Sequence, residues 1–128
     1  MRNFIILLLV FFISGCKKFP DQASLPPRST IIKYCWQTFD LGLKDKSDFV
    51  KNSTILTLGR IGNRTAVETM QAIDFKGRPS VVRTYVYTLS QLHDTAAFQA
   101  LHAYFYSNDF QIRETVVTGL ARMSDLYD

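Results

Sequence analysis

An internal repeat limits what this chain can fold into. Three segments of equal length align without gaps and follow one another at the same spacing: VKNSTILTLGRIGN at 50–63, VVRTYVYTLSQLHD at 81–94 and IRETVVTGLARMSD at 112–125. Within each copy the apolar residues recur at the spacing of an amphipathic helix. A short unit of this kind cannot bury its apolar side alone, so we expect the copies to stack on one another.

The aligned positions carry similar side chains. One column holds only leucine: Leu58, Leu89 and Leu120. We expect these leucines to be buried in equivalent positions, because they lie on the apolar stripe of each predicted helix. A second column holds small residues: Thr57, Thr88 and Gly119. Small side chains allow close approach, so a neighbouring helix is expected to pack against this column.

The last column of the repeat predicts where further helices begin. It holds strong N-cap residues: Asn63, Asp94 and Asp125. Their short side chains accept hydrogen bonds from the first free amides of a helix, so second helices are predicted over 64–74 and 95–106. Ser47 and Asp109 occupy the N-cap slot of first helices. Pro79 falls at the first helical position of another, where its missing donor is harmless.

The unit is therefore a helix, a turn, a second helix and a loop. It resembles the HEAT-like repeat of the phycobilisome-lyase type, whose pattern is roughly V-R-x-x-A-x-x-A-L-G-x-L-G-D. The copy IRETVVTGLARMSD matches best, the first copy keeps LGRIGN, and the middle copy holds Ser90 and His93 in the glycine slots. The resemblance implies an all-α fold. It would be an α-solenoid of about two and a half HEAT-like repeats, over 47–77, 78–108 and an incomplete 109–128, with an N-terminal capping helix over 31–46.

The N-terminal segment, 1–16, resembles a bacterial lipoprotein export signal. Arg2 precedes an apolar run over 4–13, and Ile13-Ser14-Gly15-Cys16 resembles the lipobox. The run is too short to cross a bilayer as a helix, which needs about 20 residues. The resemblance implies that residues 1–15 are a signal peptide and that lipid on Cys16 anchors the protein to a membrane of the cell envelope, facing the periplasm or the cell exterior. An ordinary signal peptide with a chance cysteine is the alternative.

Residues 16–30 are predicted to form a lipidated tether. They hold three of the four prolines and lack apolar periodicity, and Pro26-Pro27 favours extended polyproline geometry. Removal of Arg2 with the leader lowers the formal charge from +4 to +3. The basic residues form no run beyond Lys17-Lys18, so the charge gives little reason to expect nucleic acid as a partner.

Motifs that would carry catalysis are absent from the sequence. His93 and His102 do not stand at a helical ligand spacing, and there is no G-x-S-x-G or C-x-x-C. Gly59 and Gly62 are predicted to lie in an inter-helix turn that needs positive φ. Cys35 lacks a partner once the other cysteine is acylated, and its apolar neighbours predict a buried, inert thiol. We expect no enzyme activity, metal or cofactor, and the chromophore attachment of lyases that share the repeat does not suit an exported protein.

The second helices are predicted to carry a binding surface, since the resemblance implies that they line the concave face of the stack. Helical spacing turns one set of side chains inward: Ala66, Met70, Ile73, Ala97, Leu101 and Tyr104. The opposite side is a polar groove with aromatic ends: Glu68, Gln71, Phe75, Gln99, His102 and Tyr106. Such a groove suits protein or peptide recognition, although an ordinary solvated helix face is the alternative for each residue.

These features favour a membrane-anchored protein-binding or scaffolding module in a cell-envelope complex. A non-catalytic regulatory or accessory subunit of an envelope enzyme is the alternative function. The resemblance further implies that Arg83 and Arg113, in the arginine slot of the repeat, join neighbouring repeats through polar contacts.

The last repeat is unfinished, because only Leu126, Tyr127 and Asp128 follow Asp125. Val116, Leu120 and Met123 belong to the apolar stripe of its first helix. Stacked repeats bury their core through neighbours, so we expect a residual apolar patch at this end. A partner, a second copy of the chain in a homodimer, or missing downstream sequence would cover it.

Overall fold

The computed structural model describes residues 26–126. The chain divides into two compact units, residues 1–32 and residues 33–128, and the packing described below is that of the second. The helices are α2 (Arg28–Lys44), α3 (Asp48–Ile61), α4 (Arg64–Gln71), α5 (Pro79–Ser90), α6 (Thr95–His102), α7 (Phe110–Arg122) and the 3-10 helix η1 (Ser124–Leu126). Within residues 26–126 there is no strand, which confirms the predicted all-α class.

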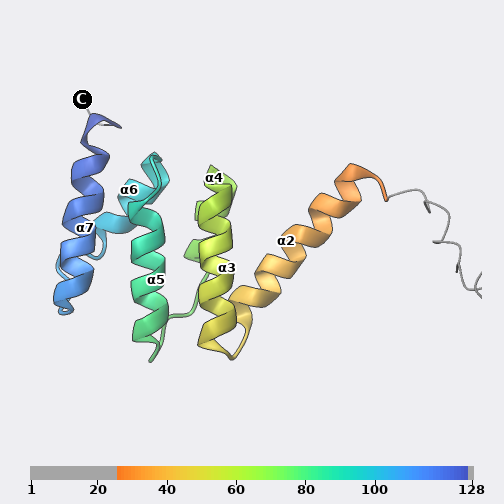
Figure 1. Ribbon diagram of the computed structural model, residues 1–128, viewed down its shortest axis with the longest axis horizontal. Coiled ribbons are helices and arrows are strands. Elements are labelled where there is room, and N and C mark those ends of the chain that lie inside the picture. Colours follow the sequence, from red (N-terminus) through yellow and green to blue (C-terminus); the bar gives the residue numbers. More distant parts are fainter. Residues whose placement is uncertain (1–25, 127–128) are drawn as a thin grey trace, which may run out of the picture. The chain divides into compact units, whose positions relative to one another are not determined.

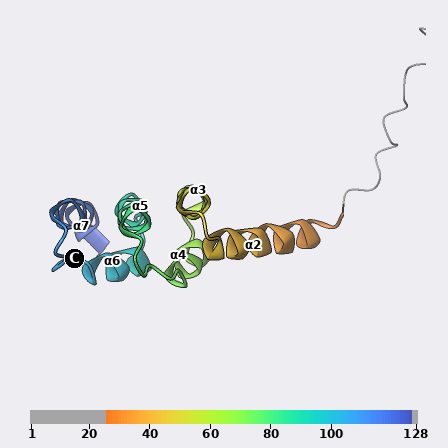
Figure 2. The same ribbon diagram turned by 90° about the horizontal axis from the view of Figure 1, so that it is seen from below.

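Helices α3 to α7 form two layers. In one layer α3, α5 and α7 lie side by side, with α5 packed against both of its neighbours (Figure 1). The other layer holds α4 and α6, which pack against each other and against the first layer (Figure 2). The turns at 62–63 and 91–94 are too short to carry the chain elsewhere, so each second-layer helix packs against the helix that precedes it.

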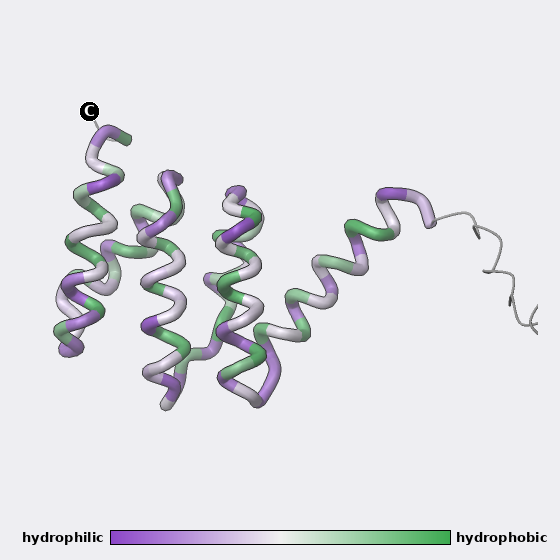
Figure 3. Tube along the Cα trace, in the orientation of Figure 1, coloured by the Kyte–Doolittle hydropathy of each residue, from purple (hydrophilic) through white to green (hydrophobic). Residues whose placement is uncertain are grey.

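Apolar residues recur along each helix (Figure 3) and meet between the layers. Leu58 and Leu89 are fully buried, whereas Leu120, on the outermost helix, is half-buried. The inward set of the second layer is placed as predicted: Ala66, Met70, Ile73, Ala97 and Leu101 are buried, and Tyr104 is half-buried against the core. The helical spacing thus identified the buried side of both layers.

Side-chain caps fix where three helices begin. Asn63 accepts from the amide of Ala66 at 2.9 Å, and Asp94 accepts from the amide of Ala96 at 2.8 Å. Asp109 likewise caps α7, and Pro79 occupies the first turn of α5 as predicted. Ser47 stands at the N-cap of α3 without a side-chain cap bond; its own amide donates to Asp45 instead. The second-layer helices end earlier than expected, at Gln71 and His102.

Two glycines act differently from each other. Gly62 has φ of +64° and ends α3, as predicted. Gly59 lies inside α3, so the prediction that it belongs to the turn is wrong. A Cβ there would lie 2.2 Å from Cγ2 of Thr88, and one at Gly119 would lie 2.7 Å from Cβ of Ser90. Glycine is needed at both positions because neighbouring first-layer helices touch there.

The small column therefore has the predicted role at two of its positions. Thr88 and Gly119 each face the preceding first-layer helix at close range. Thr57 is exposed, because α3 is the first helix of its layer within the described residues. Whether a residue of this column is buried depends on whether a preceding helix packs against it. The repeat pattern alone does not specify that.

The three residues expected to form an apolar patch at the C-terminal end are largely covered, but two other apolar residues of α7 remain exposed, Phe110 at 69% and Val117 at 52%. Val116 and Met123 are buried, and Leu120 is half-buried. Asp125 does not cap a further helix but lies in η1, which brings Leu126 onto the core. The amide of Leu126 donates to the carbonyl of Met123 at 3.0 Å and closes this turn. Where a second helix was expected, this 3-10 turn adds one half-buried apolar side chain to the cover of α7.

Helix α2 begins at Arg28, before the capping helix expected over 31–46, and so takes in the end of the expected tether. Leu43 is buried, and Trp36 and Phe39 pack on the core. Cys35 lies on another side of α2 and is exposed, so the prediction of a buried thiol is wrong. The predicted signal peptide over 1–15, the predicted lipidation site at Cys16 and the predicted tether up to residue 25 lie outside the described residues. No described helix is long and apolar enough to cross a membrane.

Candidate protein-binding surfaces

The predicted binding surface lies on the second layer. Glu68 and Gln71 are exposed on α4, and Gln99 and His102 are exposed on α6. Tyr106, in the turn after α6, is 86% exposed. Nε of Arg64 lies 3.0 Å from Oε1 of Glu68, one helical turn away, in an exposed ion pair. Five of the six predicted residues are therefore accessible to a partner.

Phe75, the sixth predicted residue, is half-buried and packs against the core instead. Its ring centroid lies 4.9 Å from that of Tyr85, and the ring of Tyr85 lies 6.0 Å from that of Tyr104. Burial raises the pKa of Tyr85, and the neighbouring Tyr104 adds to this effect. Because α4 ends at Gln71, the chain turns before Phe75 and packs its ring inward. The second helix predicted over 64–74 is longer than α4, and this difference explains why Phe75 was expected on the exposed side.

An aromatic cluster marks the C-terminal end of α6. The rings of His102 and Phe105 stack with centroids 6.3 Å apart, and those of Phe105 and Tyr106 meet edge to face at 5.1 Å. All three side chains are exposed. The sequence did not single out Phe105, since it was assigned to a continuing helix. The actual turn, in which the amide of Phe105 donates to the carbonyl of His102, gathers the three rings.

Polar contacts join the first-layer helices. Arg78 forms an ion pair with Asp48 of α3, and Oγ of Ser80 donates to the same carboxylate at 2.9 Å. The hydrogen bonds from Ser80 and Arg78 hold the pKa of Asp48 below its ordinary value. Further along, Nη1 of Arg122 donates to Oε1 of Gln91 at 3.3 Å. Adjacent helices of the first layer are thus joined by polar side chains as well as by their apolar core contacts.

Arg83 occupies the position where the repeat predicts a contact between copies. Its Nη2 lies 2.8 Å from Oδ2 of Asp109, the N-cap of α7. The hydrogen bond from Arg83 is the main cause that lowers the pKa of Asp109. Arg113 behaves differently: its Nη1 donates at 2.7 Å to the carbonyl of Ser107, in the loop just before its own helix. Of these two arginines, Arg83 alone joins two helices of the first layer.

The residues that could have held a metal do not gather. Nε2 of His93 lies 3.4 Å from Oδ2 of Asp125, while His102 belongs to the aromatic cluster. Across residues 26–126, no three side chains of His, Cys, Asp or Glu come close enough to share an ion.

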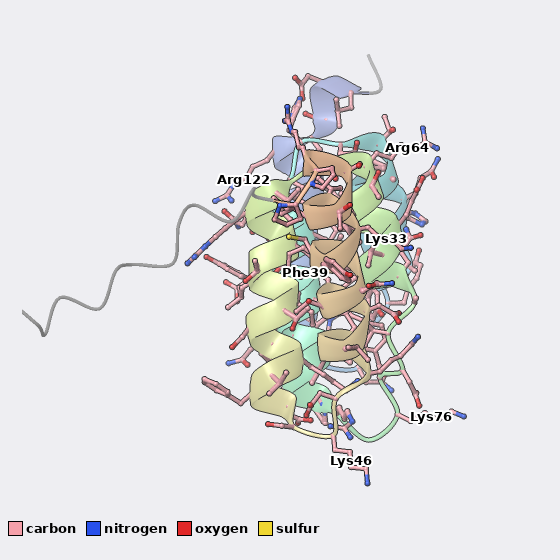
Figure 4. The ribbon with its side chains drawn as sticks, turned by 90° about the vertical axis from the view of Figure 1, so that its right-hand side faces the viewer. Lys33, Phe39, Lys46, Arg64, Lys76 and Arg122 are labelled. Carbon is pink, nitrogen blue, oxygen red and sulfur yellow. The ribbon has the colours of Figure 1, made fainter. Side chains whose placement is uncertain are left out.

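Two hollows lie on the first layer, on surface that the sequence did not single out. One, of about 200 Å³, lies between α3 and α5, and the other, of about 250 Å³, lies between α5 and α7. Tyr87 lines both. Figure 4, which looks along the layers, places Arg122 of the first layer and Arg64 of the second on opposite sides. The molecule therefore offers two separate surfaces.

Comparison with known proteins adds no family assignment. No model of a protein family matches the chain, and no curated protein matches it significantly.

Proposed function

We propose that this protein is a lipid-anchored, non-catalytic module of the cell envelope that binds a partner protein through its second helical layer. The binding surface comprises the exposed side chains of α4 and α6 and the turn after α6: Glu68, Gln71, Gln99, His102, Phe105 and Tyr106. The fold that presents it is proposed to be a HEAT-like solenoid.

The aromatic cluster of His102, Phe105 and Tyr106 is the observation that carries this proposal. Tyrosine and phenylalanine are enriched at protein interfaces, where a rigid ring buries a large area at a small entropic cost. Here three rings contact one another while remaining exposed. They lie at the end of α6, whose exposed side also carries the amide of Gln99, a polar group of the kind found at an interface rim.

Recurrence of contacts supports the solenoid part of the proposal. The Gly59–Thr88 contact joins α3 to α5, and the Ser90–Gly119 contact joins α5 to α7, with the same separation in sequence. The leucine column and the caps at Asn63 and Asp94 recur at the spacing of the repeat. A stack in which each unit contacts only its neighbours has this kind of recurrence.

Anchoring is proposed from the sequence, which places Cys16 directly behind the apolar leader. Only a short stretch of chain separates it from α2, and an extended stretch advances about 3.1 Å per residue. The anchor would therefore tether the helical layers to the membrane, where a partner held in the same membrane is present at high effective concentration.

Loss of binding without loss of folding is the experimental test. The double substitution Gln71→Ala/His102→Ala removes two exposed side chains, so the thermal midpoint should change little. We expect it to reduce the amount of partner recovered by cross-linking from intact cells. Tyr106→Ser should reduce recovery further, because it removes the most exposed ring. Undiminished recovery with all three substitutions combined would refute the assignment of this surface.

A further inference from the structure

We propose a second docking surface, on the first helical layer, that binds an extended acidic segment of a partner protein. It is formed by the two hollows that meet at Tyr87. Arg60 lines one of them, and Arg122 donates to Gln91 of the same lining. This inference goes beyond the proposed function, because it uses the opposite layer and different residues.

Close contact between helices forms the base of the hollow between α3 and α5. Gly59 has no side chain, and Thr88 of the neighbouring helix contacts it directly. Leu56, Arg60, Tyr87 and Gln91 line the hollow with Gly59 and Thr88. Leu56 is 42% exposed and Tyr87 54% exposed, so apolar surface remains open to solvent. At about 200 Å³ the space suits one apolar side chain.

The second hollow continues the surface across α5. It is lined by Arg83, Val86, Tyr87, Gln111, Ile112 and Thr115. Packed helices lie about 8–10 Å apart, and an extended chain advances about 3.3 Å per residue. A few residues of an extended segment therefore reach from one hollow to the next. Tyr87, shared by both hollows, would contact the segment in the middle.

Charge identifies the kind of segment that fits. Arg60 is exposed and, within residues 26–126, forms no ion pair and no side-chain hydrogen bond. Arg122 donates to the neutral Gln91 and has no carboxylate partner in the same range. Helices α3, α5 and α7 contain two acidic residues, Asp48 and Glu114, and a third, Asp109, is the N-cap of α7 and is paired with Arg83 of the second hollow. Asp48 is held by Arg78 at the far end of α3, and Glu114 lies two turns before Arg122.

In the described part of the chain, two guanidinium groups thus lack a carboxylate partner: Arg60, which lines an apolar hollow, and Arg122, which is hydrogen-bonded to Gln91 of the same lining. Guanidinium binds carboxylate in a bidentate, charge-assisted manner, which gives both affinity and orientation. An apolar side chain in the hollow and a carboxylate over Arg60 would satisfy both features together. Arg60 also lies in the last turn of α3, where a cation complements the helix dipole. Binding and stability must therefore be measured separately.

A labelled peptide is the probe. The mature chain, residues 16–128, is produced without the leader and titrated into a fluorescein-labelled hexapeptide of alternating leucine and glutamate. We expect saturable binding, and at least roughly tenfold weaker binding to Arg60→Glu, since a charge-assisted contact is replaced by repulsion. Arg64→Glu, an equally exposed substitution on the second layer, should change the affinity less than twofold. Tyr87→Ser should weaken binding, whereas Tyr106→Ser should not.

Two further probes separate other sources of the signal. The peptide with lysine in place of glutamate should bind weakly, and equal binding would overturn the proposed charge recognition. Vesicles with anionic headgroups should bind wild type and Arg60→Glu alike. Loss of vesicle binding in Arg60→Glu with unchanged peptide binding would assign this surface to lipid and overturn the proposal. Unaltered peptide affinity in both Arg60→Glu and Tyr87→Ser, at an unchanged thermal midpoint, would also overturn it.

Discussion

At the scale of single residues, small side chains decide how closely the first-layer helices approach. Gly59 and Gly119 lie inside helices, where glycine costs roughly 1 kcal/mol relative to alanine. Each contacts a neighbouring helix at a distance that leaves no room for a Cβ. Glycine lowers helix propensity at these sites, but it lets the helices approach closely enough for their apolar stripes to pack together.

Gly59→Ala should therefore destabilise the fold, although alanine is the better helix former. The new methyl would clash with Cγ2 of Thr88, and overpacking of this kind costs about 1–3 kcal/mol. Chemical denaturation gives the free energy of unfolding. Thr88→Ala removes the clashing methyl, so adding Gly59→Ala to it should be neutral or stabilising. An equal loss of stability in both backgrounds would show that this contact is not the cause.

Cys16 is the residue on which the proposed membrane attachment depends. Cys16→Ser removes the thiol that the lipobox resemblance marks for acylation, so the variant should incorporate no fatty-acid probe and leave the membrane fraction or stay unprocessed. Metabolic labelling followed by membrane fractionation measures both. Cys35→Ser, the matched control, should label as the wild type does. Equal labelling of Cys16→Ser and wild type would contradict the anchor.

At the scale of helices, the sequence predicted what periodicity determines and missed what depends on contacts between elements. The burial of Leu58 and Leu89 follows from an apolar stripe that any packed helix must cover. The ends of α4 and α6 do not follow from such a stripe. Each ended early, and this moved Phe75 into the core and brought Phe105 into the exposed aromatic cluster.

Surface predictions were correct where periodicity along one helix decides exposure, and wrong where contacts between helices decide it. Gln71 and His102 were correctly placed on the exposed side, since they lie opposite buried residues of the same helix. Cys35 was misplaced because its apolar neighbours in sequence turn to different sides of α2. The hollows at Tyr87 lie between helices, and a pattern read along one helix carries no information about them.

Central and terminal helices should respond differently to the same substitution. Leu89→Ala opens a cavity in the middle of the first layer and should cost about 2–5 kcal/mol. Leu120→Ala, at the equivalent position of the outermost helix, should cost less, because that leucine is only half-buried. Urea denaturation compares the two variants. Equal costs would mean that α7 is covered as completely as α5.

The Arg83–Asp109 contact should make stability sensitive to acid. The pKa of Asp109 is lowered in the folded protein. Its contribution is therefore complete above the ordinary value of 3.8 and is lost as pH falls through the lowered pKa. Asp109→Asn keeps an N-cap side chain but removes the charge, so its unfolding midpoint should fall less steeply with pH below about 4.

Arg83→Gln provides the matched test of that cause. It removes the main donor to Asp109, so the acid dependence should flatten in this variant as well. In the Arg83→Gln background, Asp109→Asn should alter the pH dependence of the unfolding midpoint much less than it does in the wild type. A full additional effect there would show that the contact between α5 and α7 is not the source.

At the scale of the whole molecule, the two layers give the protein two surfaces with different chemistry. The second layer presents the exposed rings of His102, Phe105 and Tyr106 beside the amides of Gln71 and Gln99. The first presents apolar hollows bordered by arginine. A small chain with two such surfaces could hold two segments of one partner, or two partners, near the membrane that is proposed to anchor it. This arrangement suits scaffolding in an envelope complex, the function proposed above.

Site-specific cross-linking in intact cells tests this account most directly. A photoreactive amino acid in place of Tyr106 should yield one discrete cross-linked species in the membrane fraction. The same amino acid in place of Phe49, an exposed residue outside both proposed surfaces, should not. Combining the Tyr106 position with Cys16→Ser should abolish the species, because the anchor brings the two proteins together. A cross-link from the Phe49 position alone, or a Tyr106 cross-link that is unchanged by Cys16→Ser, would contradict a membrane-anchored binding module that uses its second layer.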